Sequence, residues 1–114
     1  MNDNCLFCRM SQGALPVDKV YEDEQVFAIK DINPRAPVHV MIIPRAHIPS
    51  AAQLSEADGA LLNHIFATAN RVAQSQNVDK SGYRLTFNVG NDCGQTIYHL
   101  HLHLLGVREL DPDA

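Results

Sequence analysis

The stretch His99-Leu100-His101-Leu102-His103-Leu104-Leu105 decides the fold of this 114-residue chain. Successive side chains of a β-strand point to opposite faces, so the three histidines share one face, and Leu100, Leu102 and Leu104 share the other. Imidazoles spaced about 6.5–7 Å apart are a poor way to fill a core, because each buried polar ring needs hydrogen-bond partners. The pattern therefore predicts a final strand from Ile97 to Leu105, with the core on its leucine face and a site on its histidine face.

The remaining apolar segments predict the partners of this strand. Runs of β-branched and apolar residues indicate strands, and apolar residues recurring at three-and-four spacing indicate a helix that packs on a sheet. The fold class is therefore α+β, with a mainly antiparallel sheet of about five strands, one long helix and a short N-terminal helix. The expected elements are a helix from Cys5 to about Met10, a hairpin of 19–21 and 26–29, strands 38–43 and 83–89, and a helix with apolar positions 61, 62, 65, 66, 69, 72 and 73, opened by a capping box at Ser55 and Asp58.

Composition limits the classes of function. A chain of 114 residues with 46% apolar residues fits a single domain over 1–114, in which 108–114 form a short acidic C-terminal tail. The net charge is −4, and the nine Lys and Arg residues form no run, which argues against a nucleic-acid polymer as partner. No apolar segment reaches membrane-spanning length, so we expect no membrane partner and a cytoplasmic protein.

The histidine face and the loop before it predict a pocket for one phosphate group. Histidine can act as a neutral nucleophile and as a hydrogen-bond donor, which suits phosphoryl chemistry. The loop Gly90–Gly94 supplies flexible backbone, and Asn88, Gln95 and Thr96 supply neutral hydrogen-bonding groups. A metal-binding strand or a merely polar one is the alternative interpretation of three alternating histidines.

The segment Gln95–Leu105 resembles the signature of the histidine triad superfamily, His-φ-His-φ-His-φ-φ, where φ is apolar. Further agreement covers nearly the entire chain, and the branch that the chain resembles most is that of the histidine triad nucleotide-binding phosphoramidases. The other agreeing segments are Asp31–His39, Ile43–Ile48, Gly82–Arg84 and Asn88–Gly90.

This resemblance implies roles for the histidines. His101 would attack the α-phosphorus of a nucleotide to give a nucleotidyl-histidine intermediate, and the carbonyl of His99 would fix its tautomer. His103 would donate a hydrogen bond to a phosphate oxygen. His39 would orient the row from behind.

The resemblance also implies a nucleotide-binding set. Asn88, Gln95 and Thr96 would position the phosphate, and Asp31 would hold the ribose hydroxyls. A slot for the base is expected from apolar residues for which ordinary core packing is the alternative. These residues are Phe7, Met10, Phe27 and Ile32.

A metal site is the third expectation. Cys5 and Cys8 can place two thiolates on one ion, and His47 and His99 would complete a Cys₂His₂ set that resembles the zinc-bearing branch of the superfamily. Zinc would then be structural, with catalysis left to His101. In the alternative interpretation the two cysteines are small buried hydrophobic residues.

The leading functional hypothesis is a hydrolase of purine nucleoside phosphoramidates, such as adenosine phosphoramidate, or of aminoacyl adenylates. Hydrolysis of dinucleoside polyphosphates is the enzymatic alternative, since it shares the nucleophile and differs in the leaving group. A non-catalytic nucleotide- or protein-binding regulatory module and a metal-storage or metal-sensor protein are alternatives of other classes. The resemblance further implies a homodimer in which the C-terminal tail of one subunit tunes the leaving-group preference at its partner's site.

Overall fold

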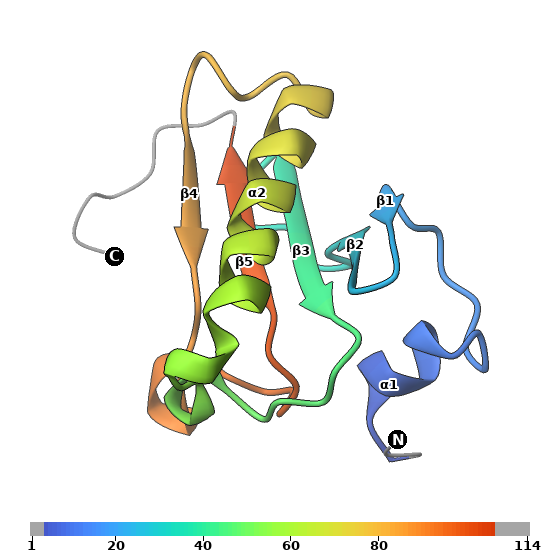
Figure 1. Ribbon diagram of the computed structural model, residues 1–114. Coiled ribbons are helices and arrows are strands. Elements are labelled where there is room, and N and C mark those ends of the chain that lie inside the picture. The colour runs from blue at the N-terminus through green and yellow to red at the C-terminus, as the bar shows by residue number, and fades with distance from the viewer. Residues whose placement is uncertain (1–3, 107–114) are drawn as a thin grey trace.

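The computed structural model describes residues 4–106, which form one antiparallel sheet with helices on its two faces (Figure 1). The strand order is β1-β2-β3-β5-β4, and every neighbouring pair is antiparallel. This arrangement confirms the predicted fold class. The elements are α1 Leu6–Ser11, β1 Tyr21–Glu22, β2 Val26–Lys30, β3 Val38–Pro44, α2 Gly59–Ser75, β4 Tyr83–Thr86 and β5 Leu102–Gly106, with 3-10 turns η1 Ala51–Gln53, η2 Glu56–Asp58 and η3 Asn91–Cys93.

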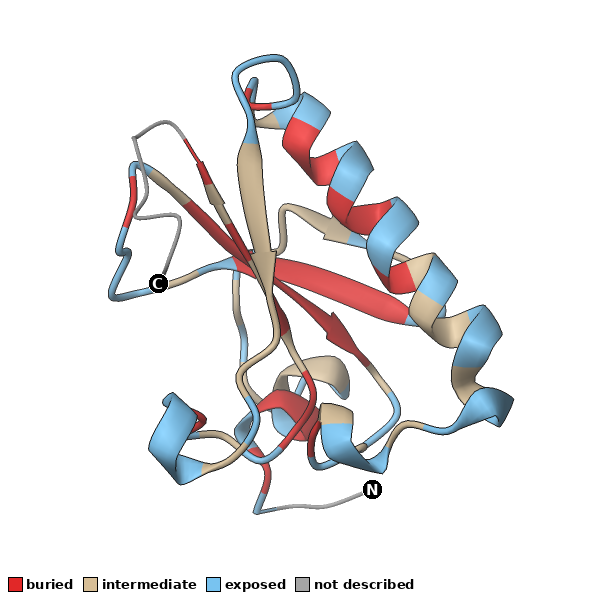
Figure 2. Cartoon of the chain, turned by 90° about the vertical axis from the view of Figure 1, so that its left-hand side faces the viewer, coloured by how far each residue is buried: buried red, intermediate tan, exposed pale blue. Residues whose placement is uncertain are grey.

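The central strand β3 and its neighbour β2 are buried on both faces (Figure 2). The alternation of their side chains divides the interior into two cores. Val40 and Ile42 of β3 point toward the long helix α2, together with Leu102 and Leu104 of β5. The alternate residues of β2 and β3 point to the opposite face of the sheet and pack against α1 and the residue before it. These are Phe27, Ile29, Met41 and Ile43, in contact with Cys5, Phe7 and Cys8. One face therefore stabilises the sheet, and the other builds the site.

The long helix forms as its apolar spacing predicts. The capping box of Ser55 and Asp58 is present, although it opens η2, from which α2 continues directly. Ile65, Ala69 and Val72 pack on the sheet, as expected for positions three and four apart. Phe66 does not belong to this stripe, because its side chain is 36% exposed and stands edge-on to Phe87.

The prediction of one strand from Ile97 to Leu105 is wrong in its first half. Strand β5 begins only at Leu102, which pairs with Ile42 near the end of β3. Before that point the chain leaves the sheet, and the amide of Leu100 donates to the carbonyl of Ile48. The leucines nevertheless remain on the side of α2, and His101 and His103 remain on the opposite side, with ring centroids 4.9 Å apart.

Two further expectations concern the C-terminal tail and membrane-spanning segments. The predicted C-terminal tail, 108–114, lies outside the described residues. Within residues 4–106, none of the helices has the length and apolar character needed to cross a membrane.

Candidate functional site

A cleft of about 320 Å³ lies between α1 and the histidine face of the sheet. Its volume is within the range of small-molecule sites, roughly 300–1,000 Å³. One wall is apolar and comes from α1 and the strands, and the other is polar and comes from the loops after β2 and β4. The residues that line the cleft include Phe7, Met10, Ile29, Asp31, Ile32, Arg35, Asn88, Gly94, Thr96, His101 and His103.

His101 has the geometry of a neutral nucleophile. Its Nδ1 lies 2.7 Å from the carbonyl oxygen of His99, and since a carbonyl only accepts, Nδ1 carries the proton. Burial lowers the pKa of His101 below its ordinary value, although the His99 carbonyl and the charge of Asp31 act in the opposite direction. The neutral ring therefore keeps its lone pair on Nε2, in the residue that lines the cleft. The ring of Phe7 packs against it at 5.2 Å between centroids.

His39 and His103 form a chain of hydrogen bonds that fixes a second tautomer. The backbone N–H of Arg35 donates to Nδ1 of His39 at 3.1 Å, so the proton of neutral His39 must be on Nε2. That Nε2 lies 2.9 Å from Nδ1 of His103 and 3.4 Å from a carboxylate oxygen of Asp31. Nδ1 of His103 therefore accepts, and its remaining nitrogen, Nε2, carries a proton that is available to the cleft.

The electrostatics keep both of these rings neutral near pH 7. Burial, followed by the neighbouring His101 and His39, lowers the pKa of His103 to about 4, despite the opposing charge of Asp31. Burial also lowers the pKa of His39, and Arg35 adds to this effect while Asp31 opposes it. The chain of hydrogen bonds thus presents an N–H donor to the cleft without a positive charge on the imidazoles.

The polar wall carries hydrogen-bonding groups along the cleft. Asp31 accepts from the amide of Asn33 at 2.8 Å, which orients its carboxylate. Gly94 has φ of +87°, a left-handed conformation that favours glycine, and a Cβ there would stand 4.0 Å from the side-chain nitrogen of Asn88. Thr96 lines the same wall. Ile32 is 92% exposed at the cleft, so an apolar side chain faces solvent where a ligand could cover it.

Two residues that were expected to contact the nucleotide, Gln95 and Phe27, do not line the cleft, and His39 and His99 lie behind it. Gln95 is buried, with its Nε2 donating to the carbonyls of Pro49 and Ile97 and its Oε1 accepting from the amide of Gly90, so it holds the loop. Phe27 is fully buried within the sheet core. His39 acts through His103, and His99 belongs to a separate cluster described below.

Several residues that line the cleft were not expected from the sequence. Ile29 lies two positions after Phe27 on the same face of β2, and it reaches the cleft because it is nearer to Asp31. The alternation of β2 could have indicated it. Leu6 and Met41 line the apolar wall as well, and Lys30 and Arg35 add two cations on either side of Asp31.

Cys5, Cys8, His47 and His99 converge on one point and could hold a metal ion. Their ligand atoms all lie within 4.8 Å of one another. His99 has no solvent exposure, and its Nε2 donates to the carbonyl of Pro44 at 2.6 Å, which leaves the lone pair of Nδ1 directed at the two thiols. Burial lowers the pKa of His99 further below its ordinary value, so the ring is neutral, as a metal ligand must be.

The spacing of these atoms fits tetrahedral coordination. Nδ1 of His47 lies 3.2 Å from Nδ1 of His99, and the sulfur–nitrogen distances are 3.3, 3.3 and 3.6 Å. A tetrahedral ion with bonds of about 2.0 Å to nitrogen and about 2.3 Å to sulfur requires edges of about 3.3 Å between nitrogens and about 3.5 Å between nitrogen and sulfur. His101 is not part of the cluster.

Comparison with known proteins gives consistent matches along the whole chain. The family model described as "Scavenger mRNA decapping enzyme C-term binding" matches residues 4–111. A curated relative from Escherichia coli K12, named purine nucleoside phosphoramidase, is 37% identical over 112 residues, which cover 98% of this chain and 94% of the relative.

Solved structures agree with this match. A HIT family hydrolase from Clostridium thermocellum superimposes with a TM-score of 0.94 at 46% identity, covering 98% of this chain and 97% of that one. A HIT family hydrolase from Legionella pneumophila gives a TM-score of 0.93 at 44% identity, covering 96% and 97%.

Proposed function

Since this chain belongs to the histidine triad (HIT) family and is a hydrolase of that family, we propose that it cleaves purine nucleoside phosphoramidates through a nucleotidyl-histidine intermediate. The observation that carries the proposal is the state of His101. Its ring is neutral, its Nδ1–H is held by the carbonyl of His99, and it lines the cleft without belonging to the metal cluster. Such a ring can use the Nε2 lone pair as a nucleophile.

The proposed reaction has two displacement steps at phosphorus. Nε2 of His101 attacks the α-phosphorus, a nitrogen–phosphorus bond forms, and the bond from phosphorus to the leaving amine breaks as the amine takes up a proton from solvent. Water then attacks the same phosphorus and releases a proton to solvent, the bond to His101 breaks, and a nucleoside monophosphate is released. The N–H at Nε2 of His103 would donate to a phosphate oxygen, which carries more charge in the transition state.

The composition of the cleft supports a nucleoside monophosphate as the group transferred. The carboxylate of Asp31 can accept hydrogen bonds from the ribose hydroxyls, and Asn88 and Thr96 can donate to the phosphate. The apolar wall of Phe7, Met10 and Ile29, with the exposed Ile32 at its edge, suits a flat base. The name of the Escherichia coli relative supports a purine and an amine leaving group. Adenosine phosphoramidate and aminoacyl adenylates are substrates of this class.

Dinucleoside polyphosphates are the second candidate, and one observation favours them. Lys30 and Arg35 both line the cleft, and with Asp31 they give it a local excess of positive charge in a chain whose net charge is −4. A leaving group that carries further phosphates would be attracted by these side chains. Separate rates on the two classes of substrate decide between them.

We propose that Cys5, Cys8, His47 and His99 bind a metal ion and that this ion is zinc. Two thiolates and two imidazoles in tetrahedral spacing are a donor set that zinc prefers, and four protein ligands leave no position for substrate. Zinc when bound would supply a structural cross-link. Its ligand His99 offers the carbonyl that orients His101, so the metal would stabilise the backbone behind the nucleophile.

A homodimer is part of the proposal. Strand β4 lies at the edge of the sheet, where its outer backbone groups can pair with a second copy. Two exposed apolar side chains lie near its end, since Val89 follows β4 by three residues and Phe66 of α2 stands edge-on to Phe87, directly after β4. Analytical ultracentrifugation should give the mass of two chains, and a monomer at micromolar concentration would contradict this part.

The test of the proposed function is turnover by the purified protein. We expect hydrolysis of a fluorogenic adenosine phosphoramidate to exceed that of diadenosine tetraphosphate in kcat/KM. His101→Asn should remove both activities, because amide nitrogen is not a nucleophile, while AMP binding is retained. Full activity in His101→Asn would refute the assignment, and faster cleavage of the polyphosphate would favour the second candidate.

A further inference from the structure

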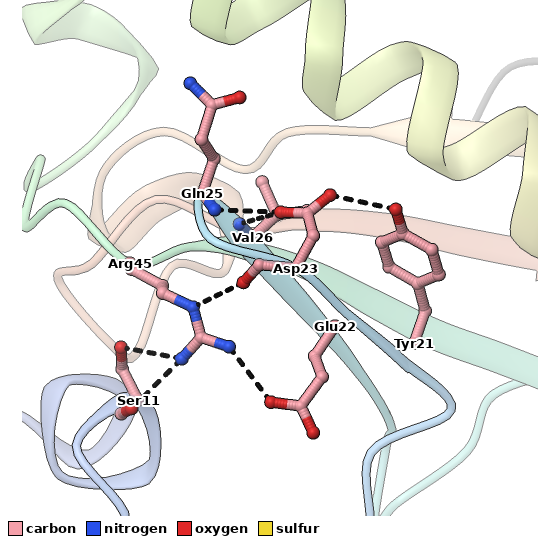
Figure 3. A network of polar contacts seen from close by, with 7 residues as sticks. All are labelled: Ser11, Tyr21, Glu22, Asp23, Gln25, Val26 and Arg45. Carbon is pink, nitrogen blue, oxygen red and sulfur yellow. Dashed lines mark hydrogen bonds and ion pairs between the residues drawn. The ribbon is translucent and has the colours of Figure 1, made fainter.

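The guanidinium group of Arg45, directly after β3, joins three segments of the chain (Figure 3). Its Nε donates to the carbonyl of Asp23 at 2.8 Å, and its Nη1 donates to the carbonyl and hydroxyl of Ser11 at 3.0 and 3.2 Å. Its Nη2 lies 3.1 Å from a carboxylate oxygen of Glu22. The group also lies 5.4 Å from the centre of the Phe27 ring. Arg45 therefore connects the last residue of α1 to the turn between β1 and β2.

Helix α1 needs such external contacts. It contains six residues, which is too short for a stable isolated helix. Yet it supplies Phe7 and Met10 to the apolar wall of the cleft and carries the two thiols of the metal cluster near its start. The position of this wall must therefore come from contacts outside the helix, namely its packing on the sheet and the polar contacts along its length.

One short segment of the chain holds both ends. At the N-terminal end, the Cys8 thiol contacts His47 at 3.3 Å. At the C-terminal end, Ser11 is bound by Arg45, two residues before His47. The ion pair with Glu22 contributes little, because that side chain is 57% exposed. The contacts to the carbonyls of Ser11 and Asp23 are therefore the ones through which Arg45 holds the C-terminal end of the helix.

We propose that Arg45 is a positioning residue that sets substrate affinity by holding the α1 wall of the cleft. The inference rests on the proposed function for its substrate. Phe7 of α1 packs against the ring of His101, but the carbonyl of His99, which α1 does not provide, fixes the tautomer and the hydrogen bond of that ring, so displacement of the wall weakens binding more than it slows the chemical step. The effect of losing Arg45 is accordingly a rise in KM with a nearly constant kcat.

The test compares Arg45→Gln and Arg45→Lys with the wild-type protein. Arg45→Lys keeps the charge but has one nitrogen in place of the guanidinium fork, so it can satisfy only part of the contacts. Arg71→Gln is the matched control, since Arg71 also contacts the β1 region, through the Tyr21 hydroxyl at 3.3 Å, but does not touch α1. The readouts are the Kd of AMP by calorimetry, KM and kcat for adenosine phosphoramidate, and hydrogen exchange of residues 4–12.

We expect Arg45→Gln to raise the Kd of AMP and KM by about 5- to 30-fold, the range produced by losing one or two hydrogen bonds. Arg45→Lys should fall between Arg45→Gln and wild type, with faster exchange in α1 and unchanged exchange in α2. Arg71→Gln should bind AMP as the wild type does. Should Arg45→Gln fail to fold, Arg45→Lys decides the question by the same readouts.

Three results would overturn the proposal. They are an unchanged AMP Kd in the folded Arg45 variants, a fall in kcat at constant KM, and an equal loss of affinity in Arg71→Gln. The proposed function fails separately, when the wild-type protein binds AMP but releases no amine. Should it neither bind AMP nor turn over, faster exchange confined to α1 in Arg45→Lys still supports the positioning role, and unchanged exchange refutes it.

Discussion

Replacing His39 by leucine tests how the fold prepares His103 for catalysis. His39 is 4% exposed and has two hydrogen-bonded neighbours, accepting from the amide of Arg35 at 3.1 Å and donating to Nδ1 of His103 at 2.9 Å. Leucine fills a similar space but offers neither group. His103 is then free to carry its proton on either nitrogen, and the tautomer with a bare Nε2 cannot donate to a phosphate oxygen.

The size of the effect follows from that lost donor. A hydrogen bond to a charged group contributes about 1.5–3 kcal/mol, which corresponds to about 10- to 150-fold in rate. We expect kcat/KM of His39→Leu to fall by this factor. The variant should also lose about 1–3 kcal/mol of unfolding free energy, because it removes two hydrogen bonds of His39, the one from the Arg35 amide and the one to Nδ1 of His103.

The assay measures kcat/KM for adenosine phosphoramidate together with urea unfolding. His39→Gln is the matched variant, since its side-chain amide nitrogen can still donate to His103 and its oxygen can accept from Arg35. It should recover most of the activity that leucine removes. Equal losses in the two variants, or a His39→Leu enzyme within twofold of wild type, would refute a role in setting the tautomer.

Three further perturbations probe the metal cluster, the packing of the sheet and the pH dependence of stability. Cys8→Ser should reduce bound zinc, measured by elemental analysis, to a small fraction of the wild-type content and should lower the thermal unfolding midpoint by more than about 4 °C. Cys93→Ser, which changes an exposed cysteine outside the cluster, should alter neither quantity. Retained zinc in Cys8→Ser would count against the site. Gly106→Ala should lower the free energy of unfolding in urea by about 1–3 kcal/mol, because its Cβ would stand 2.9 Å from a methyl group of Val78. Adding Val78→Ala should relieve that clash, so the double variant should lose less than the sum of the two single variants. Additive losses would contradict this explanation. Burial alone would raise the pKa of Asp23, but hydrogen bonds from two backbone amides, a tyrosine and a histidine hold this pKa well below its ordinary value of 3.8. The ionised carboxylate therefore stabilises the fold above about pH 4, and this stabilisation is lost as the pH falls further. Asp23→Asn should therefore cost about 1–3 kcal/mol at pH 7 and progressively less in acid, and a constant difference from pH 7 to pH 3 would argue against this.

The fold was predictable from the sequence wherever backbone periodicity decides it. Alternation along a strand fixes which side chains share a face, so the separation of leucines from histidines could be inferred without coordinates. The starting point of β5 could not, because it depends on where the neighbouring β3 stops pairing. The histidines at 99 and 101 keep their side of the sheet although they precede the strand.

The site was less predictable where a short or irregular segment sets the geometry. The expectation named Phe27 for the apolar wall, but Ile29 on the same face reaches the cleft, because the placement of α1 determines which end of β2 is open. The position of Gln95 was also not predictable, because its hydrogen-bond partners include the carbonyl of Pro49, which is far away in the sequence. No local pattern encodes such contacts. The contacts of Arg45 with Ser11 and Asp23 could not be predicted for the same reason.

The most direct test of a nucleophilic His101 is mass spectrometry of the protein quenched during turnover of adenosine phosphoramidate. We predict one adenylyl group on the peptide that carries His101, and none in His101→Asn. An adenylyl group on His99 or His103, or product formation with no adduct at any quench time, would contradict it.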